Sequence, residues 1–306
     1  MLKYALKRIL QTIPMLIVLS MVVFGMVRLI PGDPVKIMMG IDVASDSYEI
    51  EKERLGLNGT IVEQYVRWVE RLFDGDMGTS IFTKKPVLQE IGNRFKPTLI
   101  LAVGGTVLSS IIGIMFGLLA AIRHNRFTDH FLMVTSLIFV STPSFFSALI
   151  LILIFSLQLR WLPSIGLGSW KAAILPIVTL GLTAVGSLTR TTRSSMLDVV
   201  HQDYIRTARA RGVPERTIVF RDAFRNALIP VLTSIGLRFG SLLAGATLVE
   251  TVFSISGLGR FLVDGVGNRD YPVVQGTVLV MAISFVLVNL IVDLLYSAVD
   301  PRIKYS

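Results

Sequence analysis

Long apolar stretches separated by polar segments dominate the chain. A transmembrane helix needs about 20 apolar residues to cross the hydrocarbon core of a bilayer, and these stretches reach or approach that length. Unpaired backbone amides are costly in hydrocarbon, so each stretch must be helical, and continuous apolar runs exclude the alternation of a barrel strand. The pattern predicts an all-α integral membrane protein with about six transmembrane helices, approximately at 9–30, 98–122, 131–157, 173–189, 229–253 and 273–296.

The segment from 31 to 96 is the one region polar enough to fold outside lipid. Within Glu49–Phe73 the apolar residues recur near helical spacing, with breaks at Gly56 and Asn58-Gly59, which indicates two short amphipathic helices. A further amphipathic stretch, Val87–Phe95, leads into the second spanning helix. We therefore divide the chain into 1–30, the N-terminal tail and first transmembrane helix; 31–96, an extracytoplasmic segment; and 97–306, a five-helix core with a cytoplasmic loop at 190–228.

Charge sets the expected orientation. The formal net charge is +9, which in a soluble protein would fit nucleic-acid binding, but here the charge lies in short loops between apolar runs, so we expect no nucleic-acid partner. The N-terminal tail, the loops at 123–130 and 190–228, and the C-terminal tail are rich in Lys and Arg, and positive loops are retained in the cytoplasm. Both termini are predicted to be cytoplasmic.

Composition narrows the chemistry. A hydrophobic content of 52% and a mean hydropathy of +0.67 are too apolar for a water-soluble core of this size. The chain has no cysteine and three scattered histidines, which excludes disulfides and thiolate catalysis and gives no support to a Cys/His metal site. The first apolar stretch is too long for a secretory signal and is predicted to be retained.

Ionisable residues inside apolar helices are costly and are therefore candidates for function. Arg238 lies within the fifth predicted helix, Asp293 near the cytoplasmic end of the sixth, and Glu250 near the outer end of the fifth. Two interpretations stay open for Arg238. It either snorkels or pairs with a neighbour such as Asp293, or it lines a polar translocation path. Glu250 is expected to reach the membrane interface.

Two kinds of chemistry are missing from the sequence. No G-x-x-x-x-G-K-[ST] loop is present to hold nucleotide phosphates, so ATP-driven activity would need energy from another chain. No Ser/His or paired-Asp constellation lies within the apolar helices, and we predict a non-catalytic protein. Convincing midplane carboxylates for an ion-coupled carrier are also missing. A channel that needs no energy source is a further alternative.

The cytoplasmic loop carries the most informative pattern. Residues 203–211 contain good helix formers, and Gly212 follows as a helix C-terminus with arginines in the last turn. A second helix is predicted to start at Pro214-Glu215. Two short helices that meet at a glycine form a protruding knob. The alternative is a basic loop on anionic lipid headgroups, which explains the arginines but not the Gly and Pro.

At these residues the sequence resembles the permease subunits of ABC importers of the dipeptide, oligopeptide, glutathione and nickel class. Their cytoplasmic signature, Glu-Ala-Ala, three residues, Gly and later Leu-Pro, corresponds to Arg206-Thr207-Ala208, Gly212 and Ile229-Pro230. Arg206 replaces the leading acid, and Pro230 lies further from Gly212 than in the general signature. Similar segments elsewhere are Lys7-Arg8, Pro31-Gly32-Asp33-Pro34, Gly75–Ser80, Trp161-Leu162-Pro163 and Val249–Gln275.

The resemblance implies a type I ABC importer permease fold in a bacterial inner membrane. It implies that the chain lies in a lipid bilayer and has four protein partners. These are a homologous second permease subunit, two cytoplasmic ATPase subunits that carry ATP and Mg, and an extracytoplasmic substrate-binding protein. This chain itself is expected to bind no cofactor. The implied ATPase-contact residues are Asp203, Tyr204, Arg206, Thr207, Ala208, Arg209, Ala210, Arg211, Gly212 and Val213.

The expected cargo is a dipeptide, glutathione or a short oligopeptide, because the sequence of residues 203–211 is similar to that of the peptide-transport branch of the family. Nickel or another small solute is the alternative within the family. Hypotheses from other classes are an ion-coupled secondary carrier and a membrane scaffold or receptor without transport activity.

Overall fold

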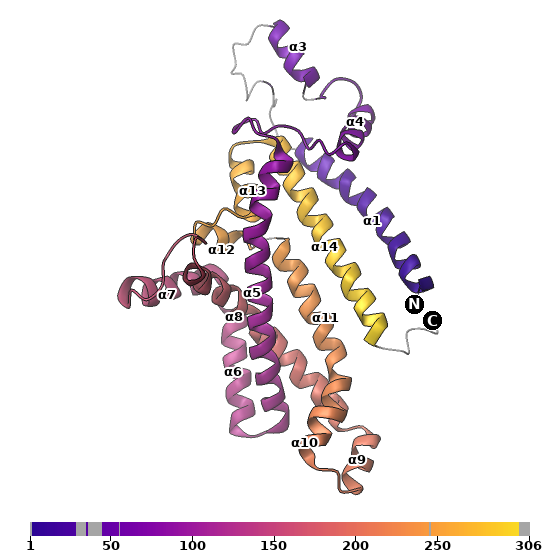
Figure 1. Cartoon of the computed structure of the whole chain (residues 1–306), viewed down its shortest axis with the longest axis vertical. Coiled ribbons are helices and arrows are strands. Elements are labelled where there is room, and N and C mark those ends of the chain that lie inside the picture. Colours follow the sequence, from indigo (N-terminus) through magenta and orange to yellow (C-terminus); the bar gives the residue numbers. More distant parts are fainter. Residues whose placement is uncertain (1, 29–34, 36–44, 55, 245, 300–306) are drawn as a thin grey trace.

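The computed structural model describes residues 2–28, 35, 45–54, 56–244 and 246–299. Within these ranges every regular element is a helix, and the one β contact is an isolated bridge between Thr79 and Pro86. The long helices α1 (Leu2–Arg28), α5 (Val87–Ile122), α11 (Phe224–Leu243) and α14 (Tyr271–Val299) run roughly along the long axis of the molecule (Figure 1). The predicted all-α class is confirmed.

Five helical stretches are long and apolar enough to cross a bilayer, and a sixth is present if a bent pair counts as one span. The bent pair joins α6 (Phe127–Ser141) to α7 (Ser144–Leu151) and the π-helix η1 (Ile152–Gln158). This agrees with the expectation of about six. The five single spans are Arg8–Met26, Val87–Ile122, Trp170–Val200, Glu215–Leu243 and Tyr271–Leu294.

A proline breaks the third predicted span. The chain bends by 100° between α6 and α7, so residues 131–157 do not form one straight helix. Thr142, which precedes Pro143, has extended backbone angles of φ −83° and ψ 122°. Steric contact with the proline ring disfavours the helical conformation at such a position, and this ends α6.

Helix α8 (Trp170–Val200) is the most buried of the five spans and lies against α5, α6 and α11. It extends beyond the predicted fourth span into the expected loop at 190–228. A Cβ added at Gly113 of α5 would come 2.6 Å from Cβ of Leu188, and Gly236 of α11 is equally tight against Val292 of α14. These glycines let helices approach closely, which helix association in lipid requires.

Two short helices precede α5 in the predicted extracytoplasmic segment. They are α3 (Ser45–Arg54) and α4 (Ile61–Phe73), and between them Gly56 and Gly59 have positive φ angles of 70° and 86°. Trp68 of α4 is buried against Phe24 of α1 and Leu279 of α14. Two helices are therefore present as predicted, but only α4 is amphipathic, and it packs onto the ends of the spans, whereas α3 is polar all round and its Ile50 is exposed. Helix α5 already starts at Val87, inside the segment assigned to 31–96.

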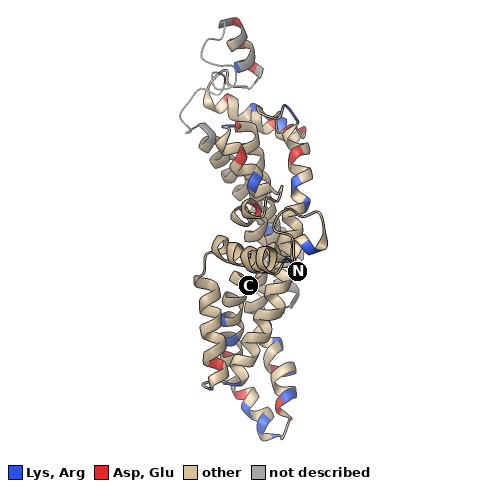
Figure 2. Ribbon diagram, turned by 90° about the vertical axis from the view of Figure 1, so that its left-hand side faces the viewer, with Lys and Arg blue, Asp and Glu red and all other residues tan. Residues whose placement is uncertain are grey.

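At the opposite end of the molecule, α9 (Asp203–Ala210), α10 (Glu215–Thr217) and the π-helix η2 (Ile218–Ala223) connect α8 to α11 (Figure 1). Lys, Arg, Asp and Glu gather toward the two ends of the molecule, with few in between (Figure 2). This distribution is typical of a protein whose middle lies in hydrocarbon.

The fifth predicted span ends earlier than expected. Helix α11 stops at Leu243, and α12 (Thr247–Val252) and α13 (Leu258–Gly267) follow as short separate helices. Glu250 of α12 does not reach an interface, because its side chain is 0% exposed. Its carboxylate accepts hydrogen bonds from the Thr98 hydroxyl (2.7 Å) and the Arg260 backbone N–H (2.9 Å).

Glu250 and Thr98, which we call the Glu250 network, accept hydrogen bonds from backbone amides at the start of α13. The Thr98 hydroxyl oxygen accepts a hydrogen bond from the Leu258 backbone N–H (2.8 Å), while Glu250 takes that of Arg260. The first amides of a helix have no partner within the helix. Side chains from α5 and α12 therefore satisfy two of them, which ties α12 and α13 to the end of α5.

Candidate functional site

Helices α9 and α10 form a compact projection, residues 203–217, which we call the knob. Helix α9 ends at Ala210, and the chain reverses at Gly212 before α10 starts after Pro214. Both the glycine stop and the proline start agree with the sequence pattern. The knob lies at the end of the molecule opposite α3 and α4 (Figure 1).

Gly212 terminates α9 in a left-handed conformation, with φ +75°. Its N–H donates to the Arg209 carbonyl (2.9 Å), and the Val213 N–H donates to the Ala208 carbonyl (3.2 Å). This pair of bonds is the Schellman motif. A Cβ at Gly212 would meet nothing within 4 Å, so glycine is favoured here by backbone conformation and not by space.

The inner side of α9 is apolar and packed. Ile205 and Ala208 are 0% and 5% exposed and belong to a buried cluster that includes Met196 of α8 and Ile218 of η2. The cluster also takes in residues of α5 and of α11, at Leu118 and Ala227. The knob is therefore fixed to the ends of three long helices and is not a free loop.

The outer side of the knob is charged. The Arg209 guanidinium donates two hydrogen bonds to the Glu215 carboxylate, at 2.8 and 3.2 Å, and thereby joins α9 to α10. The hydrogen bond to Glu215 raises the pKa of Arg209 above its ordinary value. The Tyr204 hydroxyl accepts a hydrogen bond from the Asn226 amide at 2.8 Å, which connects α9 to α11.

The structure brings all the predicted contact residues of the knob together, but not all on its surface. Ala208 is buried and Val213 is half-buried, so these two support the knob from within. The exposed ones are Asp203, Tyr204, Arg206, Thr207, Arg209, Ala210, Arg211 and Gly212.

Arg238 is half-buried on α11 and does not pair with Asp293. Its Nη2 donates to the Thr183 hydroxyl of α8 at 2.7 Å, and its Nε has no partner among the described residues. Asp293 of α14 instead accepts a hydrogen bond from Arg8 Nε of α1 at 2.6 Å. The interpretation of an Arg238–Asp293 pair was wrong.

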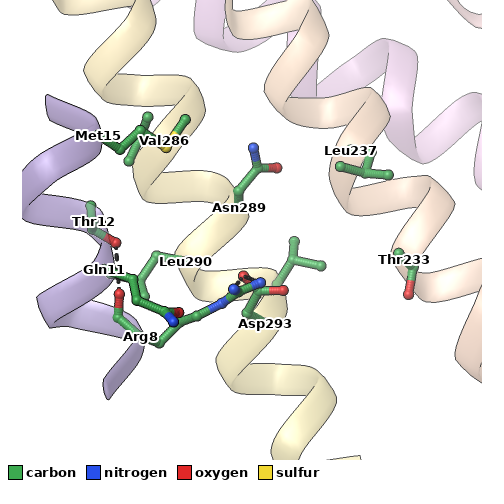
Figure 3. A pocket seen from close by; sticks show the side chains of 11 residues that line it. Arg8, Gln11, Thr12, Met15, Thr233, Leu237, Val286, Asn289, Leu290 and Asp293 are labelled. Atoms are coloured by element: carbon green, nitrogen blue, oxygen red, sulfur yellow. Dashed lines mark hydrogen bonds and ion pairs between the residues drawn. The ribbon is translucent and has the colours of Figure 1, made fainter. Parts of the chain in front are cut away.

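The Arg8–Asp293 pair borders a cleft of about 310 Å³ between α1, α11 and α14. Figure 3 shows Arg8 reaching from α1 to Asp293, with Thr233 and Leu237 on the facing side of α11. Because the pair joins residues 285 positions apart, it ties the first span to the last.

Sequence reasoning missed a set of polar residues beside Arg238. Three lie on α8 and three on α11, each set at i, i+4 and i+7, so each occupies one helix face. We call this set the polar lane. It consists of Thr183, Ser187 and Arg190 on α8, and Ser234, Arg238 and Ser241 on α11. The spacing was visible in the sequence, but only ionisable residues inside the predicted spans were considered.

A second charged cluster holds α6 to α8. Asp129 of α6 is 1% exposed and accepts two hydrogen bonds from Arg193 of α8, at 2.6 and 2.7 Å, and one from the Asn125 backbone N–H. A buried carboxylate requires such partners. The pair fixes the turn between α5 and α6, and Arg193 lies three residues beyond Arg190 of the polar lane on α8.

Comparison with protein families gives two matches that together span nearly the whole chain. Residues 113–305 match the family described as binding-protein-dependent transport system inner membrane component. Residues 1–102 match the N-terminal part of the membrane component of the same kind of system.

Curated relatives align over the full length of both chains. The glutathione transport system permease protein GsiC of Salmonella paratyphi A is 43% identical over 306 residues, with 100% of each chain covered. The protein of the same name in Escherichia coli K12 is 42% identical over the same length and coverage.

Among solved structures, the MetNI methionine ABC transporter in an inward-facing conformation is similar in fold. The TM-score is 0.61 at 19% sequence identity, and the match covers 70% of this chain and 97% of that one. The expected permease fold is therefore confirmed.

Proposed function

Because the chain belongs to the family of inner membrane components of binding-protein-dependent transport systems, we propose that it forms half of the translocation path for glutathione or another short peptide. It is the transmembrane subunit of an ABC importer. The names of the relatives support glutathione over nickel as the cargo. They also favour the ABC importer over the hypothesis of an ion-coupled carrier.

The proposed assembly has the components that such a family needs in general: a partner permease, ATPase and a binding protein. We propose that the partner permease is a homologue of this chain and that two cytoplasmic ATPase subunits hold the ATP and Mg. The chain itself would be non-catalytic and bind no cofactor. It would lie in a bacterial inner membrane with both termini, the knob and the ATPases on the cytoplasmic side.

The structure of the knob is the observation that carries this proposal. A contact that transmits movement from an ATPase must be exposed on its outer face and rigidly joined to the spans. The exposed face of α9 meets the first condition, and the buried cluster around Ile205 meets the second. The knob also connects α8, through η2, to α11, and these two helices carry the polar lane. Movement of the knob would therefore shift the walls of the path as semi-rigid levers.

Cross-linking tests the ATPase contact. The chain has no cysteine, so Ala210→Cys introduces a single thiol on the exposed side of α9. With a thiol-to-amine cross-linker added to the assembled transporter, we expect a product that contains this chain and the ATPase. The matched control is Ala208→Cys, which places the same residue on the buried side of α9. Equal yields from both variants, or no product from Ala210→Cys, would refute the contact.

Uptake tests the cargo. In proteoliposomes that contain the complete importer and its binding protein, we expect ATP-dependent accumulation of labelled glutathione and none of nickel. Accumulation of nickel without glutathione would replace the proposed cargo while leaving the importer assignment in place.

A further inference from the structure

The polar lane is the feature of the spans that packing does not explain. On α8 its residues lie on the side away from α5, because α8 meets α5 through Gly181 and Leu188, nearly half a turn around the helix. On α11 they lie away from α14, which packs against Gly236 and Gly240. The hydrogen bond between Arg238 and Thr183 joins the two sets side by side.

The lane runs through a depth where lipid would otherwise lie. Thr183 is near the middle of α8, a span of 31 residues, and Arg238 contacts it there. Ser187, Arg190 and Ser241 are exposed. An arginine on a lipid-facing surface near the middle of a span is costly, so intramembrane ionisable residues face the protein interior or a water-filled cavity. The lane therefore faces an aqueous path.

The lane is cationic, and its arginines have unused hydrogen-bond donors. No described carboxylate lies within ion-pair distance of Arg238 or of Arg190, and the buried Arg238 Nε has no hydrogen-bond partner among the described residues. Arg238 donates one hydrogen bond to Thr183, whereas a guanidinium has five N–H donors. A guanidinium fork matches a carboxylate with two parallel hydrogen bonds.

We propose that the polar lane binds the carboxylate of the transported peptide, with Arg238 as the residue that contacts it. The proposal rests on the proposed function and deepens it, because it makes peptides with a free carboxylate, such as glutathione, the preferred cargo. The hydroxyl groups of Thr183 and Ser234 donate to carbonyls of their own helices, and Thr183 accepts from Arg238, so the two arginines supply the donors for an anion.

Thiol labelling tests the lane without requiring uptake. Ser187→Cys and Ser241→Cys are made separately in the cysteine-free chain, within the assembled complex in native membranes. Each is treated with an anionic and a cationic methanethiosulfonate of similar size. Each rate is divided by the rate of the same reagent with a small thiol in solution, and we expect the normalised rate to be about 3- to 10-fold higher for the anionic reagent, because the lane attracts negative charge. Adding Arg238→Gln should bring the ratio toward one.

Two controls give this experiment a decisive outcome. Ile111→Cys, exposed on the apolar side of α5, should react with neither reagent because it faces lipid. Arg126→Gln, which removes a charge from the exposed turn before α6, should leave the ratio unchanged. Lane thiols as inert as Ile111→Cys, or a ratio at or below one, would overturn the proposal.

Uptake then tests the ligand. Proteoliposomes with the full importer are given a labelled tripeptide either with a free C-terminal carboxylate or as its amide. We expect Arg238→Gln to reduce uptake of the free peptide about 10- to 100-fold, the effect of losing a charge-assisted hydrogen-bond pair, and to reduce that of the amide much less. Arg238→Lys should restore part of the loss.

The outcomes separate this inference from the proposed function. If the wild-type importer accumulates neither peptide, the proposed cargo is wrong. The ratio of the two labelling rates then tests by itself whether the polar lane attracts anions. If the wild type accumulates the free peptide and Arg238→Gln lowers both probes equally, Arg238 is a structural residue and the carboxylate site is refuted.

Discussion

Gly212 is the residue on which the shape of the knob depends. Its φ of +75° is strained for a β-branched residue, at a cost of about 1–3 kcal/mol. Gly212→Val should insert normally, because the spans are untouched, but should distort the reversal between α9 and α10. At about 1.4 kcal/mol for each factor of ten, we expect roughly tenfold less uptake per ATP hydrolysed. The measurement is the ratio of the two rates in proteoliposomes.

Gly212→Asn is the matched control, because asparagine enters the left-handed region far more readily than valine. It should retain most of the coupling. If the knob instead lay on lipid headgroups, Gly212→Val would be nearly silent, while Arg209→Ala and Arg211→Ala would each remove about 1 kcal/mol of surface attraction.

The conformation of Gly212 could be predicted because helix stop signals are local: the last turn, the glycine and the following proline lie within a few residues. The partners of Arg238 and Glu250 could not. Thr183 is 55 positions from Arg238, and Thr98 is 152 positions from Glu250. Hydropathy places a charged residue at a depth along its helix but does not tell which helix lies beside it.

At the scale of elements, Glu250 is the residue that joins α12 and α13 to α5. Glu250→Ala leaves the Arg260 N–H and the Thr98 hydroxyl without their acceptor and opens a cavity. We expect it to destabilise the protein by about 2–4 kcal/mol, measured as a lower unfolding temperature in detergent. Glu250→Gln keeps the volume and should lie between Glu250→Ala and the wild type.

Asp264→Ala is the control for this loss, since Asp264 is an exposed acid on α13 with a weak contact to Arg260 at 3.9 Å. It should change stability by no more than about 0.5 kcal/mol. Equal unfolding temperatures for Glu250→Ala and the wild type would show that the start of α13 does not need the network.

The sequence located the spanning helices better than it located their ends. Helix α8 continues to Val200, past the polar residues where its apolar pattern stops, because Arg193 pairs with Asp129 and Met196 packs beneath the knob. Tertiary partners make these turns stable where hydropathy predicts a loop. Pro143 marks the place of the break between α6 and α7, but the residues around it do not predict the angle of 100°.

At the scale of the whole molecule, the charges gather at two opposite ends (Figure 2), which fits a chain with the knob on one side of the membrane and α4 on the other. We expect Phe82→Cys, 71% exposed beside the start of α14, to react with an impermeant thiol reagent from outside the cell. His201→Cys, exposed beside the knob, should react only after the membrane is opened. Labelling of whole cells and of opened membranes is compared.

Phe82 is a better position for this measurement than Ser80, which is 2% exposed and donates a hydrogen bond to Asp270. The reverse labelling pattern at either cysteine would overturn the orientation drawn from the positive loops. The side on which the termini lie follows from the same result, because α1 starts and α14 ends away from α4 (Figure 1).

The π-helix η2 between the knob and α11 fixes the direction in which the knob points. A π turn holds one residue more than an α turn, so it acts as a single-residue insertion absorbed without a loop. Each residue advances an α-helix by about 100°, and the extra one therefore resets the angular register between the segments on its two sides. The direction of α9 around the axis of α11 can therefore change only in steps of one residue, which are about 100° each. A turn that switches between π and α would rotate the knob in one discrete step and not by gradual bending.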